Sequence, residues 1–123
     1  MIDFATDSTF KLTAASTRDA RPVEPLLIHG EELVYAFKSV RDLVVFTNKR
    51  IIAVDVQGMT GKKKDFTSLP YSKVQVFSIE TAGTFDLDAE LELWFSAVGK
   101  VRFEFRGGSD IRQISQMIAS YVL

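Results

Sequence analysis

The chain has 123 residues, 46% of them hydrophobic and 25% charged, and this composition excludes the low hydrophobicity and high charge of disordered chains. Its length fits one domain, and its formal net charge of −1 gives no reason to expect nucleic-acid binding. The absence of cysteine excludes disulfide frameworks, thiol catalysis and thiolate metal sites.

The amino-terminal stretch is rich in Ser, Thr, Asp and Ala and shows no regular hydrophobic period, which predicts an arm over residues 1–21 before a domain of residues 22–123. It lacks the basic and apolar regions of a signal peptide, and no run is apolar enough to span a bilayer, so we expect a cytoplasmic protein. Pro22, Glu24 and Gly30 suit the first turn, the positive end and the residue after a helix of about two turns.

Residues 31–40 alternate in character and predict a strand that leads into a β-hairpin. The hairpin consists of two runs rich in Val, Ile, Leu and Phe, residues 43–47 and 51–56, separated by a short polar turn. The two-residue period of a strand predicts two apolar faces: Leu43, Val45, Ile51 and Ala53 on one, and Val44, Phe46, Ile52 and Val54 on the other. Something must therefore cover the second face, and the candidates are the amino-terminal segment, the curvature of the sheet and another copy of the chain.

The second half of the chain predicts further strands and a closing helix. Residues 57–64 form a predicted exposed loop, and residues 65–71 and 74–82 are predicted strands. Residues 90–95 and 101–106 alternate apolar with charged side chains, which is typical of neighbouring strands with one buried face. A helix follows, with Ser109 as its predicted cap and Asp110 complementing the helix dipole. Its apolar residues recur at helical spacing: Ile111, Ile114, Met117, Ile118, Tyr121 and Val122.

About seven strands and one terminal helix predict a mainly β (α+β) fold: a partly open barrel of two roughly orthogonal antiparallel sheets, capped by the amphipathic helix. The segments VRDLVVFTNKRIIAVDVQGMTGKK (40–63), SLPY (68–71) and SIETAGTFDLDAELELWF (78–95) resemble the signature segments of the bacterial pleckstrin-homology (PH) domain family. The resemblance implies a PH-like fold, ring-shaped homo-oligomers, and neither catalytic residues nor a cofactor.

A cluster of cations is the first candidate binding site. Three adjacent lysines on an exposed loop, together with the cations of the hairpin turn, suit a phosphorylated headgroup or another anion, and the alternative is a solvated loop. These candidate residues are Lys49, Arg50, Lys62, Lys63 and Lys64. A nucleotide-binding P-loop is excluded, because Val56 stands where the first glycine is required and no Ser or Thr follows Lys62.

A run of carboxylates is the second candidate. The two-residue spacing of Asp86, Asp88, Glu90 and Glu92 places all four on one strand face, where they could gather a cation. The alternative is a solvated face that pairs with the arginines of the next strand, and the calcium-loop pattern fails because Leu91 replaces the required glycine. We therefore predict no metal site.

Trp94 lies on the polar side of its strand, where it is either an exposed interface anchor or a residue buried by sheet curvature. The leading hypothesis is a noncatalytic scaffold domain that forms a ring-shaped homo-oligomer and contacts other cytoplasmic proteins. Its predicted interface residues are Val44, Phe46, Ile52, Val54 and Trp94. The alternative is an anion-binding module that uses the lysine loop at the inner membrane surface. No enzyme is predicted, because the sequence shows no recognisable nucleophile, base or metal site.

Overall fold

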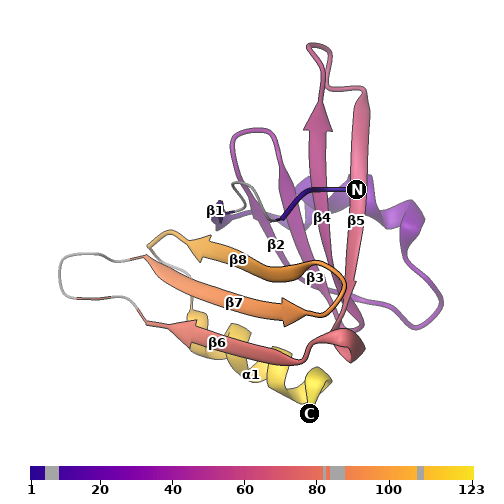
Figure 1. Ribbon diagram of the computed structural model, residues 1–123. Helices are drawn as coiled ribbons and strands as arrows, with labels where there is room; N and C mark the ends of the chain where they lie inside the picture. The colour runs from indigo at the N-terminus through magenta and orange to yellow at the C-terminus, as the bar shows by residue number, and fades with distance from the viewer. Residues whose placement is uncertain (5–8, 82, 84–87, 108–109) are drawn as a thin grey trace. The chain divides into compact units, whose positions relative to one another are not determined.

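The computed structural model describes residues 1–4, 9–81, 83, 88–107 and 110–123 (Figure 1). Within these residues the chain forms eight β-strands, two 3-10 helices and one α-helix. The mainly β fold with a carboxyl-terminal helix is therefore confirmed, with one strand more than the sequence predicts.

The chain divides into two compact units that are interleaved along the sequence. Unit 1 comprises residues 1–2 and 14–70, and unit 2 comprises residues 3–13 and 71–123. Each unit takes residues from two separate stretches, so both depend on the amino-terminal segment.

Unit 1 contains an antiparallel meander of four strands in the order β5-β4-β3-β2 (Figure 1). The strands are β2 (Leu33–Lys38), β3 (Leu43–Thr47), β4 (Arg50–Gln57) and β5 (Lys63–Pro70). Strands β3 and β4 form the predicted hairpin, and β5 is paired with β4 over its whole length. The connection between β4 and β5 is shorter than the predicted loop of residues 57–64, because Gln57 belongs to β4 and Lys63 and Lys64 belong to β5.

The 3-10 helix η1 (Thr17–Leu26) covers one face of this meander. It begins five residues before the predicted start at Pro22. It contains two prolines, and a proline inside a helix lacks the N–H donor and its ring clashes with the carbonyl of residue i−4, which disfavours a regular α-helix. Its residues Ala20 and Val23 are fully buried against β3 and β4. The amino-terminal segment is thus the cover for this apolar face.

The register of the hairpin corrects the predicted faces. Leu43 lies opposite Val54, and Val45 lies opposite Ile52, so these four residues share the face that η1 covers. The other face carries Val44 and Phe46 opposite Ala53 and Ile51. The predicted assignment of β4 was wrong because alternation relates residues within one strand, whereas the turn sets which face of β4 meets which face of β3.

Unit 2 contains three antiparallel strands: β6 (Val76–Glu80), β7 (Ala89–Phe95) and β8 (Gly99–Phe105). The predicted alternation is confirmed, because Leu91, Leu93 and Phe95 of β7 and Val101, Phe103 and Phe105 of β8 are buried, whereas the charged side chains between them are at least partly exposed. Residues 9–12 of a further strand, β1 (Thr9–Ala14), pair in parallel with β8. This eighth strand comes from the segment that was predicted to be an arm.

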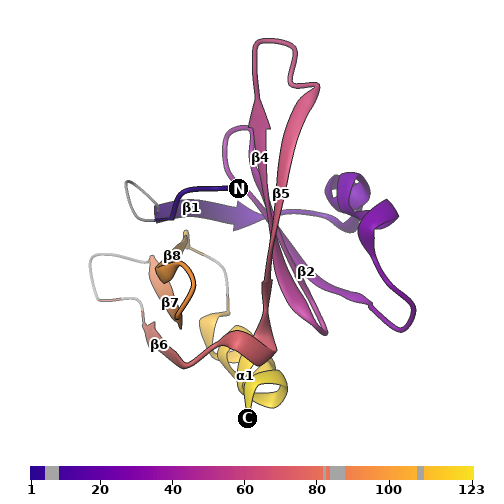
Figure 2. The same ribbon diagram turned by 45° about the vertical axis from the view of Figure 1, so that its right-hand side comes forward.

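The α-helix α1 (Ile111–Val122) packs against β7 and the 3-10 helix η2 (Tyr71–Lys73), as Figure 2 shows for η2. Its N-cap is Asp110, whose carboxylate accepts hydrogen bonds from the backbone N–H groups of Arg112 and Gln113 at 3.1 and 3.2 Å. The predicted cap, Ser109, lies outside the described residues. Tyr121 stacks on Tyr71, with ring centroids 5.6 Å apart. The amphipathic helix is therefore confirmed, with its cap one residue later.

Candidate functional site

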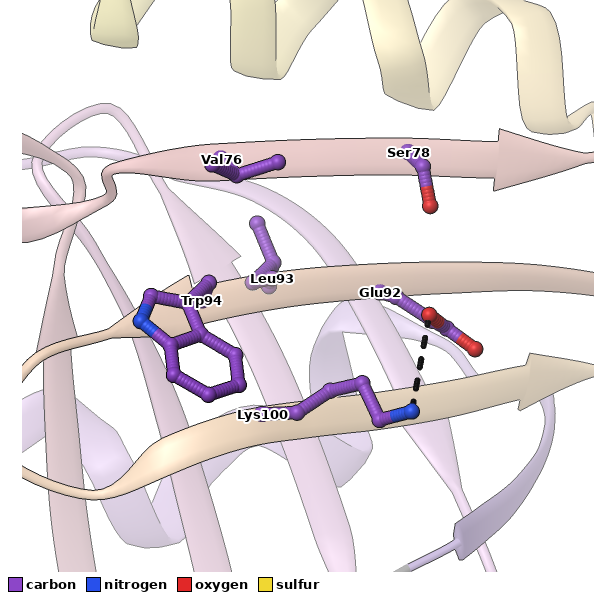
Figure 3. Close-up of a pocket in the computed structure, with 6 residues that line it drawn as sticks. All are labelled: Val76, Ser78, Glu92, Leu93, Trp94 and Lys100. Atoms are coloured by element: carbon purple, nitrogen blue, oxygen red, sulfur yellow. Dashed lines mark ion pairs between the residues drawn. The ribbon is translucent and has the colours of Figure 1, made fainter.

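A hollow lies on the outer face of the β6–β7–β8 sheet, which is the face opposite the buried apolar side chains (Figure 3). Val76 of β6 lies opposite Trp94 of β7, and Trp94 lies opposite Lys100 of β8, so three neighbouring strands contribute one row of side chains. The hollow has a volume of about 280 Å³ and is lined by Val76, Ser78, Glu92, Leu93, Trp94 and Lys100.

The residue that distinguishes this hollow is Trp94. Strand alternation sends Leu91 and Leu93 into the core and places Trp94 among carboxylates, where it is 48% exposed. Val76, on the edge strand, is 62% exposed. Of the two readings that the sequence allows for Trp94, the structure supports the exposed one.

The charged residues beside the hollow are paired with one another. Glu92 accepts a hydrogen bond from Arg102, at 3.2 Å from Nε to Oε1, and lies 4.0 Å from the Lys100 ammonium (Figure 3). Arg102 also lies 3.8 Å from Glu90, as predicted for the solvated face. An apolar group that enters the hollow therefore contacts Val76 and Trp94, while the carboxylate of Glu92 beside it already has cationic partners.

Four of the five predicted interface residues do not reach the surface. Val44, Phe46, Ile52 and Val54 are at most 1% exposed within the single chain. They also lie on two different faces of the hairpin, because Ile52 and Val54 belong with Val45 rather than Val44. The single chain already buries both apolar faces of the hairpin, so these faces give no argument for self-association. Of the five predicted interface residues, only Trp94 is exposed.

The five predicted anion-binding cations are not brought together. Lys49 and Arg50 lie at the start of β4, whereas Lys62, Lys63 and Lys64 follow its far end. A strand advances about 3.3 Å per residue, so the eight residues of β4 separate the two groups by roughly 20–25 Å. No single headgroup spans that distance.

Arg50 is committed to a buried ion pair instead of an anion site. Its guanidinium binds both oxygens of Glu31, with Nε 2.9 Å from Oε2 and Nη2 2.9 Å from Oε1. It also donates to Ser68 Oγ and to the carbonyl oxygen of Leu26, at 2.9 and 2.8 Å. The Glu31 side chain is fully shielded from solvent. Arg50 therefore joins β4 to β5, η1 and the segment before β2.

The environment of Glu31 keeps its carboxylate ionised. Burial raises the pKa of Glu31, but hydrogen bonds from Arg50, from the Thr47 hydroxyl and from the backbone N–H of Ile28 outweigh it and hold the pKa below its ordinary value. The Thr47 hydroxyl donates to Glu31 Oε2 at 2.7 Å. Thr47 Oγ1 in turn accepts hydrogen bonds from the backbone N–H groups of Lys49 and Arg50, at 3.0 Å each. This network closes the β3–β4 turn.

The lysine loop lies beside a second connection that sequence reasoning did not single out. Arg41, in the turn between β2 and β3, donates from Nη2 to the carbonyl oxygen of Gly58 in the β4–β5 loop, and both connections lie at one end of the meander (Figure 1). We call residues 39–42 and 58–64 the loop end. Val40 and Met59 are both fully exposed there, at 100% and 103%.

The cations of the loop end are accessible. Arg41, Lys62, Lys63 and Lys64 are all exposed. The Lys64 ammonium donates to the carbonyl oxygen of Gly61 at 3.1 Å, which orders the loop without neutralising the charge. In both connections an exposed apolar residue precedes a cation: Val40 precedes Arg41, and Met59 precedes the three lysines. This pattern is visible in the sequence and could have indicated the loop end.

The described part of the acidic run belongs to a row of like charges across three strands. Glu80 lies opposite Glu90, and Glu90 lies opposite Glu104. Burial, a hydrogen bond with Asp88 and the charges of Asp88 and Glu90 raise the pKa of Glu104. Asp86 lies outside the described residues. Within the part of the chain that the structure describes, no three His, Asp or Glu side chains are grouped so that they could hold a metal ion.

Eight strands in antiparallel and parallel pairs, followed by one carboxyl-terminal α-helix, define a PH-like domain. The model of the bacterial PH domain family matches residues 4–122, and the chain belongs to this family. The match begins within the segment that was predicted to be an arm. Among the described residues, every helix is too short or too polar to span a membrane.

Relatives and solved structures agree with this assignment. The uncharacterized protein YjqA of Bacillus subtilis is 48% identical over 97 residues, which cover 77% of this chain and 78% of YjqA. A DUF1696 family protein with a pleckstrin-homology domain from Shewanella loihica is 40% identical, with a TM-score of 0.79, over 93% of this chain and 99% of the other. A pleckstrin homology domain from Shewanella amazonensis is 47% identical, with a TM-score of 0.64, over 87% of each chain.

Proposed function

We propose that the chain is a noncatalytic interaction domain that assembles with copies of itself and presents the assembly to other proteins as a scaffold. The observation that carries this proposal is the half-exposed Trp94, set beside the exposed Val76 in an apolar hollow. Tryptophan is enriched among the residues that dominate binding energy at interfaces. A contact of this kind between two different surfaces closes into a ring when its rotation allows.

The rim of the hollow favours protein as the occupant. Because Glu92 is already paired with Arg102 and lies near Lys100, an apolar side chain can enter without leaving a buried charge unpaired. A hollow of about 280 Å³ accommodates one large apolar side chain rather than an extended ligand.

Light scattering coupled to gel filtration tests self-association. We expect a mass of several chains at micromolar concentration, and we expect Trp94→Ala to raise the concentration needed for assembly at least tenfold. Val40→Ser removes a fully exposed apolar side chain that is far from the hollow in sequence, so it is the control and should leave the mass unchanged. A monomer at high micromolar concentration would refute the proposal.

A second function, docking on an anionic membrane surface, is favoured by the loop end. Val40 and Met59 are fully exposed on two connections that Arg41 joins, and three lysines follow. Each cation near an anionic bilayer contributes about 1 kcal/mol, and exposed apolar side chains add to this when they enter the interface. The net charge of −1 means that attraction must come from this local group rather than from the whole chain.

Sedimentation with vesicles of anionic or zwitterionic lipid tests this second function. We expect binding to anionic vesicles at low salt that falls steeply with ionic strength, because the charges are exposed. Replacing Lys62, Lys63 and Lys64 by Ala should abolish binding, and Val40→Ser with Met59→Ser should weaken it several-fold. Lys49→Ala, at the opposite end of β4, is the control. Binding unchanged by the triple replacement would remove the basis of this function.

A further inference from the structure

We propose that strand β5 of one copy pairs in antiparallel fashion with strand β6 of a second copy, with Phe66 opposite Ser78. This inference rests on the proposed self-association and names the surfaces that carry it. It follows from the two strand edges, from their side-chain patterns and from the position of the hollow.

Both strands are edges. Among the described residues, β5 has only β4 as a neighbouring strand, and β6 has only β7. Met1 and Ile2 also contact β5, but they bind the side chains of Asp65 and Thr67, which alternate with Phe66 and lie on the other face. Along its other side, each strand presents backbone N–H and C=O groups that the strand ladders leave unpaired, and such an edge is a template for pairing with another chain. β6 carries a single charged residue, Glu80, so little in its sequence blocks an incoming strand.

The exposed side chains of the two edges have the same spacing. On one face of β5 they include Lys64, Phe66 and Ser68, and on β6 they are Val76, Ser78 and Glu80. Antiparallel pairing with Phe66 opposite Ser78 places Lys64 opposite Glu80 and Ser68 opposite Val76, all on one face of the joined strands.

This register matches apolar surface with apolar surface. Phe66 is 37% exposed in the single chain. Opposite Ser78 its ring would lie at the hollow, whose lining also includes Val76 and Trp94. The hollow of about 280 Å³ has room for a phenyl ring, so one contact would cover the exposed aromatic residues of both copies.

The same register matches charge with charge. Glu80 lies opposite Glu90 within its own sheet, and like charges directly across strands are unfavourable. An ammonium group from Lys64 of the second copy would offset this repulsion. Lys64 donates one hydrogen bond to Gly61, and its ammonium has further donors for the carboxylate.

Because the two edges differ, each copy carries one of each, and the contact can repeat from copy to copy. Single-cysteine variants test the register cleanly, since the chain has no cysteine of its own. Directly opposed residues in antiparallel strands lie within the Cα separation that a disulfide requires. Phe66→Cys mixed with Ser78→Cys, one of them carrying a mass tag, should therefore form a mixed disulfide under mild oxidation at least tenfold faster than Val40→Cys mixed with Ser78→Cys.

The mass of the unmodified chain, measured under the same conditions, separates the two levels of the proposal. An assembled chain whose Phe66→Cys and Ser78→Cys variants crosslink no faster than the control would overturn the edge pairing and leave self-association standing. A monomeric chain would overturn both.

Charge reversal provides an independent check that keeps the aromatic residues in place. Lys64→Glu and Glu80→Lys should each raise the concentration for half-assembly at least threefold, and the double variant should return it to within twofold of the original. Lys63→Glu, whose side chain points to the other face of β5, is the control and should have little effect. A double variant no better than either single one would contradict the register.

Discussion

Arg50 holds both carboxylate oxygens of Glu31, each at 2.9 Å, and so fastens the start of β4 to the segment that precedes β2. The same guanidinium reaches Ser68 on β5 and the carbonyl oxygen of Leu26 at the end of η1. One cation thus joins four segments of unit 1. Arg50, which the sequence suggested as part of an anion site, instead holds these segments together in the folded chain.

Removing this tie should destabilise the chain strongly. Arg50→Ala leaves a carboxylate that is fully shielded from solvent without its cation, and breaking a buried pair in this way costs about 3–5 kcal/mol. We expect a loss of about 3 kcal/mol in the free energy of unfolding, measured by urea denaturation. Lys49→Ala, the exposed neighbour, should change it by less than about 0.5 kcal/mol. Equal effects of the two variants would contradict the assigned role.

The stability of the chain should depend on the ionisation of Glu31. Its folded-state pKa lies below the ordinary value, so the stability that its carboxylate contributes is present above the unfolded-state pKa and is lost as the pH falls through the folded-state pKa. Glu31→Gln should therefore show a shallower loss of stability between pH 5 and acid conditions, when urea midpoints are compared across pH. Parallel curves for the variant and the original chain would count against this.

Glu104 should have the opposite dependence. Its folded-state pKa is raised, so its contribution to stability is present below the unfolded-state pKa and is lost as the pH rises through the folded-state pKa. At pH 7, Glu104→Gln removes a carboxylate beside Asp88 and Glu90, and we expect a melting temperature higher by roughly 2–4 °C, a gain of less than about 1 kcal/mol. The gain should vanish below pH 4. Glu24→Gln, on the exposed side of η1, is the control.

Phe46 should contribute to stability and not to assembly. It is fully buried and meets Phe37 edge-to-face, with ring centroids 5.7 Å apart. Phe46→Ala should lower the free energy of unfolding by about 3–5 kcal/mol, as measured by denaturant unfolding. Trp94→Ala should lower it by less than about 1 kcal/mol while it weakens assembly. A stable Phe46→Ala variant with altered assembly would contradict the burial of this residue.

Much of the fold could be predicted from the sequence because its signals are local. The alternation in β7 and β8, the apolar runs of β3 and β4, and the stripe of α1 each lie within one segment. The features that escaped prediction are set by partners distant in the sequence. β1 is defined by parallel pairing with β8, some 90 residues later, and it has no strong pattern of its own.

The candidate sites divide in the same way. The exposure of Trp94 could be predicted as one of two alternatives, because alternation gives its face but not what covers that face. The separation of Lys49 from the lysine loop follows from the length of β4, which the sequence did predict. The contribution of Arg41 could not be predicted, since it depends on a hydrogen bond between two connections that only the paired strands bring together.

The interleaving of the two units limits how the chain can be dissected. The backbone passes between them after residues 2, 13 and 70, so neither unit is a continuous stretch. A fragment of residues 71–123 would lack β1, so β8 would lose its parallel partner and become an unpaired edge strand. Experiments that assign assembly or membrane binding to one unit therefore need point variants of the intact chain. A truncated fragment would expose a new edge strand that could itself pair with other chains.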